Sequence, residues 1–237
     1  MQVEVLADPE AVARRAVAVI AEAARAAVSA RGRFLLAVSG GHTPWRMLSI
    51  LATEALPWEH MHVLQVDERV APAGHPDRNL THLRESLSAA PLAADRIHPM
   101  PVEAEDLAAA AARYAGKLRE LAGIPPVLDL VHLGLGPDGH TASLVPGDPV
   151  LEVADLDVAV TGIYQGRPRM TLTYPVLNSA RRVLWVVTGG DKQKMCPRLM
   201  DGDTMIPAGR VRRDQALLLA DRAAVGQPAT ASAPERA

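Results

Sequence analysis

The chain has 237 residues, in which 25 lysines and arginines nearly balance 27 aspartates and glutamates, so that its net charge is −2. A nearly neutral chain lacks the basic surface that general nucleic-acid binding requires, and we expect no nucleic-acid partner. The single cysteine, Cys196, excludes an intrachain disulfide and zinc sites built from several thiolates. This sparing use of cysteine suits a reducing compartment, and we expect a cytoplasmic protein.

The first segment predicts a long helix. Asp8 is a favoured N-cap residue, Pro9 suits the first turn, and Glu10 complements the helix dipole. We expect this helix to run to about residue 30 and to end at Gly32. Charged residues interrupt its run of alanine and valine, so we expect neither a membrane span, which needs about 20 mostly apolar residues, nor a secretory signal.

Short apolar runs alternate with helical patterns along the rest of the chain. Residues 33–38 read RFLLAV, which is typical of a buried parallel strand, and Pro44 can open the helix that follows. Further strands are expected at residues 61–66, 97–100, 128–135, 157–162, 169–174, 183–188 and 216–220, with a polar loop at 67–78. Further helices are expected at residues 79–89, 103–121, 175–181 and 191–200, the last kinked or shortened by Pro197.

This alternation predicts an α/β fold with a mainly parallel sheet. No internal repeat or long linker divides the chain, so we expect residues 1–226 to form a single domain. Residues 227–237 are rich in alanine, proline, serine and threonine without periodicity, and we expect a disordered tail there. Ligands of such sheets bind outside the carboxyl ends of the strands, which makes the loops after the predicted strands the candidate binding segments.

The loop after the first apolar strand has the chemistry of an anion-binding turn. Gly40 and Gly41 allow close backbone approach, Ser39 and Thr43 add hydroxyl donors, and the next helix presents free N–H groups. A plain turn that needs only small residues is the alternative. The segment AVSGG is also close to a nucleophile elbow, which would make Ser39 a nucleophile, although two glycines and a threonine suit phosphate better.

Two further loops carry charged side chains. In the DER triplet at residues 67–69, Arg69 can contact an anionic group or a developing oxyanion, with a solvated loop as the alternative. Residues 133–147, LGLGPDGHTASLVPG, hold four glycines and place Asp138 and His140 two residues apart on a tight turn. Histidine is the natural general base near neutral pH, so we favour a functional role for His140. The alternative is an Asp-Gly turn in which the histidine has no function.

Lysine is rare in this chain and occurs only at positions 117, 192 and 194. Two of the three lysines follow the strand expected at 183–188, after a pair of glycines. Of these two, Lys192 is a candidate for binding a phosphate. Arg169 begins the segment RMTLTYPVLN and is a second candidate. An exposed lysine at the start of a helix is the alternative, above all for Lys194.

The remaining histidines and the cysteine are weaker candidates. His60 and His62 have metal-like spacing on a strand, but no third ligand is evident, and we expect surface or interface histidines and no metal site. His132 lies within a strand and is expected to be structural. Cys196 has no flanking histidine or basic pair that would favour a reactive thiolate.

Four segments, in this order, resemble the 6-phosphogluconolactonase family: SGGHTP, VDERVAPAGHPDRN, DLVHLGLGPDGHTASLVPG and RMTLTYPVLNSARRVLWVVTGGDK. The resemblance spans residues 39–192 and implies a Rossmann-like, three-layer α/β/α fold. It implies hydrolysis of 6-phosphoglucono-δ-lactone to 6-phosphogluconate in the oxidative branch of the pentose phosphate pathway. The partner would be this phosphorylated sugar lactone, and neither a metal nor an organic cofactor is implied.

Matched residue by residue, the resemblance implies a phosphate site made of Ser39, Gly40, Gly41, Thr43, Arg169 and Lys192. His140 matches the catalytic histidine, with Asp138 beside it, and Arg69 would face the substrate. Asn79 matches the asparagine after the DER segment. The family usually has serine where this chain has Arg78, which puts a hydroxyl role at that position in question.

Three alternatives to the lactonase remain. The glucosamine-6-phosphate deaminases resemble this chain in the DGH segment but carry a glutamate a few residues later. Here residues 141–147 read TASLVPG and contain no carboxylate, which favours the lactonase. They also tend to have an aromatic residue where this chain has Arg69. A non-catalytic sugar-phosphate-binding protein would not need both Asp138 and His140, and a serine esterase would use Ser39.

Overall fold

The structure, a computed structural model, describes residues 1–227. Seven strands form a parallel sheet in the order β1-β10-β9-β6-β2-β3-β5. Their bounds are β1 Gln2–Leu6, β2 Phe34–Val38, β3 Met61–Gln65, β5 Ile97–His98, β6 Leu130–Leu133, β9 Val183–Val187 and β10 Ala216–Asp221. The predicted α/β fold with a mainly parallel sheet is therefore confirmed.

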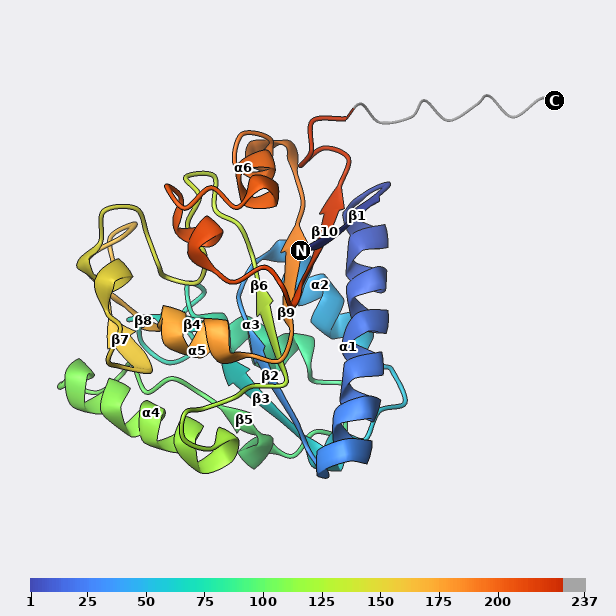
Figure 1. Cartoon of the computed structure of the whole chain (residues 1–237). Coiled ribbons are helices and arrows are strands. Elements are labelled where there is room, and N and C mark those ends of the chain that lie inside the picture. Colours follow the sequence, from blue (N-terminus) through green and yellow to red (C-terminus); the bar gives the residue numbers. More distant parts are fainter. Residues whose placement is uncertain (228–237) are drawn as a thin grey trace.

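Helices on both faces make this a three-layer structure (Figure 1). On one face lie α1 (Pro9–Arg31), α2 (His42–Leu51) and α3 (Asn79–Ser86). On the other lie α4 (Leu107–Ala122), α5 (Tyr174–Ser179) and α6 (Cys196–Asp201). Short 3-10 turns occur at Trp58–His60, Ala94–Arg96, Pro149–Glu152, Gly190–Lys192 and Pro207–Arg210.

Each face of the sheet is buried in its own hydrophobic core, because successive side chains of a strand point to opposite faces. In β2, Phe34 and Leu36 pack with the first group of helices, whereas Leu35 and Ala37 pack with the second. All five residues of β2 are buried, as expected for a central parallel strand.

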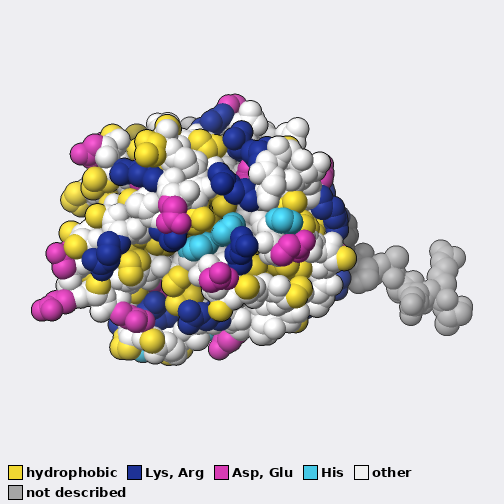
Figure 2. All heavy atoms as spheres, turned by 90° about the horizontal axis from the view of Figure 1, so that it is seen from below, with side chains coloured by type: hydrophobic (Ala, Val, Ile, Leu, Met, Phe, Trp, Pro, Cys, Tyr) yellow, Lys and Arg dark blue, Asp and Glu magenta, His cyan; other side chains and the backbone are white. Residues whose placement is uncertain are grey.

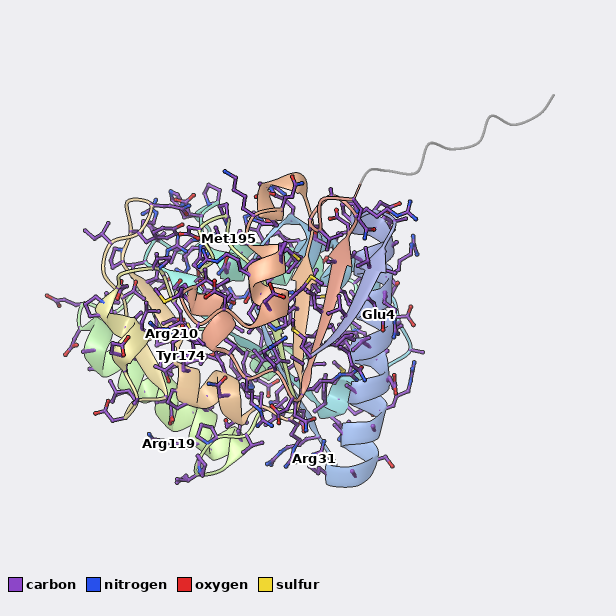
Figure 3. All side chains as sticks on the ribbon, turned by 45° about the horizontal axis from the view of Figure 1, so that its top comes forward. Glu4, Arg31, Arg119, Tyr174, Met195 and Arg210 are labelled. Atoms are coloured by element: carbon purple, nitrogen blue, oxygen red, sulfur yellow. The ribbon has the colours of Figure 1, made fainter. Side chains whose placement is uncertain are left out.

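The capping residues of α1 act as the sequence predicts. The Asp8 carboxylate accepts a hydrogen bond from the Ala11 N–H at 2.8 Å, and Gly32 ends the helix with a left-handed φ of 72°. Arg31 in the last turn pairs with Asp129 at 2.7 Å, just before β6 (Figure 3). The contact between Arg31 and Asp129 fixes the last turn of the helix against the amino-terminal end of β6.

A second, antiparallel sheet lies beside the first. It has the order β4-β8-β7, with β4 at Asp67–Arg69, β7 at Val158–Val160 and β8 at Arg169–Leu172. The predicted strands at 157–162 and 169–174 are present in shorter form, but the first three residues of the loop predicted at 67–78 form a strand. This charged triplet is extended because its backbone pairs with β8. The local sequence gives no sign of this pairing.

Other elements also differ from the prediction, mostly by a few residues at their ends, and three of the differences have an evident physical reason. The edge strand β1 was not predicted, because it is short and half exposed. The helix α4 begins at Leu107, where Asp106 caps it, and not at residue 103. The helix predicted at 191–200 is divided into the turn Gly190–Lys192 and α6, because Pro197 has no N–H and fits only the first turn of a helix.

In Figure 1 the strands β9 and β10 point toward the upper side of the view. Figure 2 looks at the lower side, where basic and acidic side chains are interspersed and histidines lie near the centre. Within residues 1–227 no helix is long and apolar enough to cross a membrane. Of the tail predicted at 227–237, residues 228–237 lie outside the described residues.

Candidate active site

A pocket of about 430 Å³ opens at the carboxyl ends of the strands. The four loops singled out in the sequence meet there. It is lined by these candidate residues, among others: Ser39, Gly40, Gly41, Thr43, Arg69, Asn79, His140, Arg169 and Lys192. Asp138 does not line the pocket but lies behind His140, and Lys194 is not among the lining residues.

His140 and Asp138 form a close pair. The Nδ1 atom of His140 lies 2.6 Å from Oδ1 of Asp138, whose same oxygen also accepts the His140 backbone N–H at 3.1 Å. Gly136 makes room for the ring, because a Cβ at that position would lie 2.0 Å from Nδ1. The DGH turn therefore sets both the distance and the orientation of the imidazole.

The charge on Asp138 decides which imidazole nitrogen carries the proton. Burial opposes ionisation, but hydrogen bonds from His140 and Tyr164 hold the pKa of Asp138 well below its usual range. A carboxylate accepts hydrogen bonds, so Nδ1 carries the proton and Nε2 keeps its lone pair. The pair has the arrangement of a general base with an orienting acid.

The sequence reasoning missed Gln165, which lines the pocket, and Tyr164, which contacts Asp138 and His140 beside it. The Tyr164 hydroxyl donates to Oδ2 of Asp138 at 3.0 Å, and Gln165 Oε1 accepts from Arg169 at 2.9 Å. Both belong to the hairpin between β7 and β8, in the second sheet, and so follow no parallel strand. The Gln165-Gly166 pair, typical of a tight turn, was the only local signal.

The glycine turn after β2 is held by its neighbours. The Ser39 hydroxyl donates to the His132 carbonyl at 3.1 Å, and its backbone N–H donates to His132 Nδ1 at 3.3 Å. Gly40 is required for close approach, since a Cβ there would lie 2.2 Å from Asn79 Oδ1. The Ser39 proton thus goes to a backbone carbonyl and not to a base, which disfavours Ser39 as a nucleophile.

Three cations line the pocket. The register of β4 on β8 places Arg69 directly opposite Arg169. Lys192 also lines it, with its Nζ 2.8 Å from Asp191. Like charges on facing positions destabilise a sheet, so the presence of two arginines on facing positions here is consistent with an anion as ligand.

The buried guanidinium of Arg169 is only partly hydrogen-bonded. It is almost completely buried, its Nε has no hydrogen-bond partner among the described residues, and burial lowers its pKa. Its guanidinium lies 4.8 Å from the centre of the Tyr164 ring. A buried guanidinium that leaves one N–H group without a hydrogen-bond partner is costly, and an anionic ligand would lower that cost.

Arg78, which stands where the resemblance led us to expect serine, does not line the pocket. Its side chain is 2% exposed and forms ion pairs with Glu68 at 3.2 Å and Glu103 at 2.7 Å. Glu68 in turn accepts the backbone N–H groups of Asn79 and Leu80, each at 2.8 Å. Arg78 therefore stabilises the start of α3 indirectly, through the Glu68 carboxylate that binds the first N–H groups of the helix.

Within residues 1–227 no group of three or more histidine, cysteine or carboxylate side chains is arranged to hold a metal ion. Cys196 is buried, and burial raises the pKa of its thiol to about 11. His62 is in contact with His98 at 2.9 Å, with Arg96 at its other ring nitrogen. These residues take no part in the pocket.

Comparison with known proteins decides the family. The family model of glucosamine-6-phosphate isomerases and 6-phosphogluconolactonases matches residues 7–219. The chain belongs to this family. A 6-phosphogluconolactonase from Synechocystis is 41% identical over 197 residues, which cover 81% of this chain and 82% of the relative.

Solved structures of the family share the fold. A 6-phosphogluconolactonase from Thermotoga maritima matches with a TM-score of 0.83 at 26% identity, over 93% of this chain and 98% of that one. A monomeric glucosamine-6-phosphate deaminase also reaches a TM-score of 0.83, at 19% identity, over 96% of this chain and 100% of that one. Since both branches of the family share the architecture, the substrate has to be argued from the site.

Proposed function

We propose that this protein hydrolyses 6-phospho-D-glucono-1,5-lactone to 6-phosphogluconate. The observation that carries the proposal is the His140–Asp138 pair at 2.6 Å, whose imidazole lines a pocket that three cations also line. An oriented base and a place for a dianion are what the hydrolysis of a phosphorylated lactone needs. Relatives that match most of the chain carry the lactonase name.

The phosphate is bound by the glycine turn at 39–43 together with Arg169 and Lys192. The turn leads into the amino-terminal end of α2, whose first N–H groups favour an anion. Arg169 brings a guanidinium with an unpaired Nε, and Lys192 a flexible ammonium. Binding at this end places the lactone ring toward His140.

His140 acts as the general base. Nε2 takes a proton from a water molecule as the water oxygen attacks the lactone carbonyl carbon, and Asp138 stabilises the imidazolium that forms. Arg69 stabilises the oxyanion of the tetrahedral intermediate. When the intermediate collapses, the bond to the ring oxygen breaks and His140 returns the proton to that oxygen. The product is the open-chain 6-phosphogluconate, and no covalent enzyme intermediate is needed.

The test compares freshly prepared 6-phosphogluconolactone with gluconolactone in a pH-stat. We expect kcat/KM to be higher for the phosphorylated lactone by about 10²-fold or more, because charged hydrogen bonds to the phosphate contribute roughly 1.5–3 kcal/mol each. His140→Ala should lower kcat by about 10²–10⁴-fold. His60→Ala, which removes an exposed histidine outside the pocket, is the matched control and should match the wild type.

Equal rates on the two lactones would contradict the phosphate site, and wild-type turnover in His140→Ala would remove the histidine from the mechanism. Release of ammonia from glucosamine-6-phosphate, with no lactone hydrolysis, would favour the deaminase alternative. Tight binding of 6-phosphogluconate without turnover of the lactone would favour a sugar-phosphate-binding protein.

A further inference from the structure

The hairpin between β7 and β8 is held beside the pocket by contacts of Tyr164 and Arg167 with other segments, and Gln165 adds a contact within the hairpin to the first residue of β8. Tyr164 donates to Asp138, Gln165 accepts from Arg169, and Arg167 forms an ion pair with Asp77 at 2.8 Å. Its tip is a tight turn in which Gln165 and Gly166 have φ values of 53° and 80°. A left-handed φ at a residue other than glycine is sparsely populated and persists where surrounding contacts impose it.

Tyr164 is in contact with two residues that line the pocket, His140 and Arg169. Its ring lies edge-on to the His140 imidazole, with centroids 5.4 Å apart and planes at 68°. The Arg169 guanidinium lies over the same ring at 4.8 Å. Its hydroxyl is 3.0 Å from Oδ2 of Asp138, while Oδ1 of that carboxylate holds His140.

We propose that Tyr164 is a positioning residue for hydrolysis. Its hydroxyl fixes the Asp138 carboxylate that orients His140, and its ring supports the Arg169 guanidinium at the phosphate end. This inference rests on the proposed function, because it assumes that His140 is the base and that Arg169 binds the phosphate.

Both hydrogen bonds from His140 go to Oδ1 of Asp138, so a separate donor to Oδ2 matters. A carboxylate held through Oδ1 alone can rotate about its own axis, and the imidazole would follow. With Oδ2 held as well, the plane of the carboxylate is set and the hydrogen bond to His140 Nδ1 keeps one direction. Burial and the charge of Asp138 raise the pKa of Tyr164, so the hydroxyl stays protonated and remains a donor at neutral pH.

The hydroxyl and the ring of Tyr164 therefore have separable effects. Tyr164→Phe removes the hydroxyl and keeps the ring, so kcat should fall about tenfold, the cost of a hydrogen bond to a charged group, while KM stays within about twofold. Tyr164→Leu also removes the aromatic face, so KM should rise a further ~3–10-fold. Tyr174→Phe is the control, since the Tyr174 hydroxyl donates to the Pro207 carbonyl outside the pocket and the residue lies beside Arg210 (Figure 3).

Proton NMR of the free protein gives a readout that does not depend on turnover. The Nδ1–H of His140, in its 2.6 Å hydrogen bond, should give a downfield signal in the wild type and in Tyr174→Phe. In Tyr164→Phe this signal should broaden by faster exchange with water. The spectra are compared at one pH, because a change of pH could also alter the charged groups that line the pocket and so move the signal. These groups are Asp67, Arg69, Arg169, Asp191 and Lys192.

An unchanged signal in Tyr164→Phe, or a wild-type kcat in that variant, overturns the positioning role. A KM in Tyr164→Leu equal to that of Tyr164→Phe overturns the part that concerns Arg169. If the wild type hydrolyses neither lactone, the proposed function fails instead, and the His140 signal in Tyr164→Phe then decides by itself whether Tyr164 holds the Asp138–His140 pair.

Discussion

Three histidines of this chain have different surroundings, and the surroundings determine what each ring can do. The His140 side chain is 20% exposed, in contact with a carboxylate, and faces the pocket. His62 is half buried and receives a hydrogen bond from Arg96, and burial with the neighbouring His98 lowers its pKa to about 4. His132 is completely buried in β6, where burial lowers its pKa to about 3. His140 is the one of the three that combines access to the pocket with a carboxylate partner.

His132 should make the stability of the protein fall with acid. In the unfolded chain a histidine titrates near ~6.5, whereas in the fold the pKa of His132 is about 3, so the unfolded state binds more protons between these values. The free energy of unfolding therefore decreases as the pH falls through this window, by about 1.4 kcal/mol per pH unit at most. Between pH 7 and 5 this single group contributes a loss of about 2 kcal/mol.

The variant that isolates this effect is His132→Asn, because an asparagine Oδ1 can replace Nδ1 as acceptor for the Ser39 N–H. Urea unfolding of both proteins at pH 7 and pH 5 measures the difference. The wild type should lose about 2 kcal/mol more than His132→Asn over this interval. Parallel losses in the two proteins would show that His132 does not titrate on unfolding in this window.

At the scale of elements, Glu68 joins β4 to α3. Its carboxylate accepts the first N–H groups of the helix, from Asn79 and Leu80, and also a hydrogen bond from Gln65. The side chain is fully buried, and Arg78 supplies the positive charge at 3.2 Å. Because α3 carries Asn79 to the pocket, this ion pair supports the site from outside it.

Removing the cation should therefore destabilise the fold strongly. Arg78→Ala leaves Glu68 as a buried charge without its nearest partner, and we expect a loss of about 3–5 kcal/mol in the free energy of unfolding. Arg84→Ala, on the exposed side of the same helix, should change it by less than about 0.5 kcal/mol. Urea unfolding of both variants at pH 7 gives the comparison, and equal stabilities would mean that Arg78 does not compensate Glu68.

The sequence predicted elements well where local chemistry determines them. Buried apolar runs marked the inner strands, and Asp8 and Gly32 marked the ends of α1. It failed at Asp67–Arg69, which is a strand only because β8 pairs with it, and it could not assign β7 and β8 to a separate sheet. Both features depend on the pairing of β4 with β8, about 100 residues away in the chain, which no local pattern records.

At the scale of the molecule, the parallel sheet brings together residues that are far apart in the chain. Strands that run in one direction end at one edge, so loops from residue 39 to residue 192 meet around the same pocket. This rule made most of the candidate site predictable. Tyr164 and Gln165 escaped it because they belong to the antiparallel hairpin, whose position depends on the pairing of β8 with β4 and on contacts with distant segments.

A pocket assembled from so many segments should couple ligand binding to global stability. If 6-phosphogluconate binds there, a concentration 100 times its dissociation constant stabilises the fold by about 2.7 kcal/mol, which raises the Tm by about 5–10 °C for a chain of this size. Gluconate lacks the phosphate and should give little shift at the same concentration. Thermal unfolding followed by circular dichroism measures both.

Two lysines, two residues apart, make the matched pair for this measurement. Lys192 lines the pocket and Lys194 does not. Loss of one charged contact of about 1.5 kcal/mol weakens binding about tenfold, so Lys192→Ala should keep about half of the stabilisation by 6-phosphogluconate at an unchanged ligand concentration. Lys194→Ala removes the same charge from the molecule and should keep all of it. If the two variants lose the same share, the effect comes from the net charge of the protein and not from a contact at the phosphate, and the phosphate site would then have to be placed elsewhere.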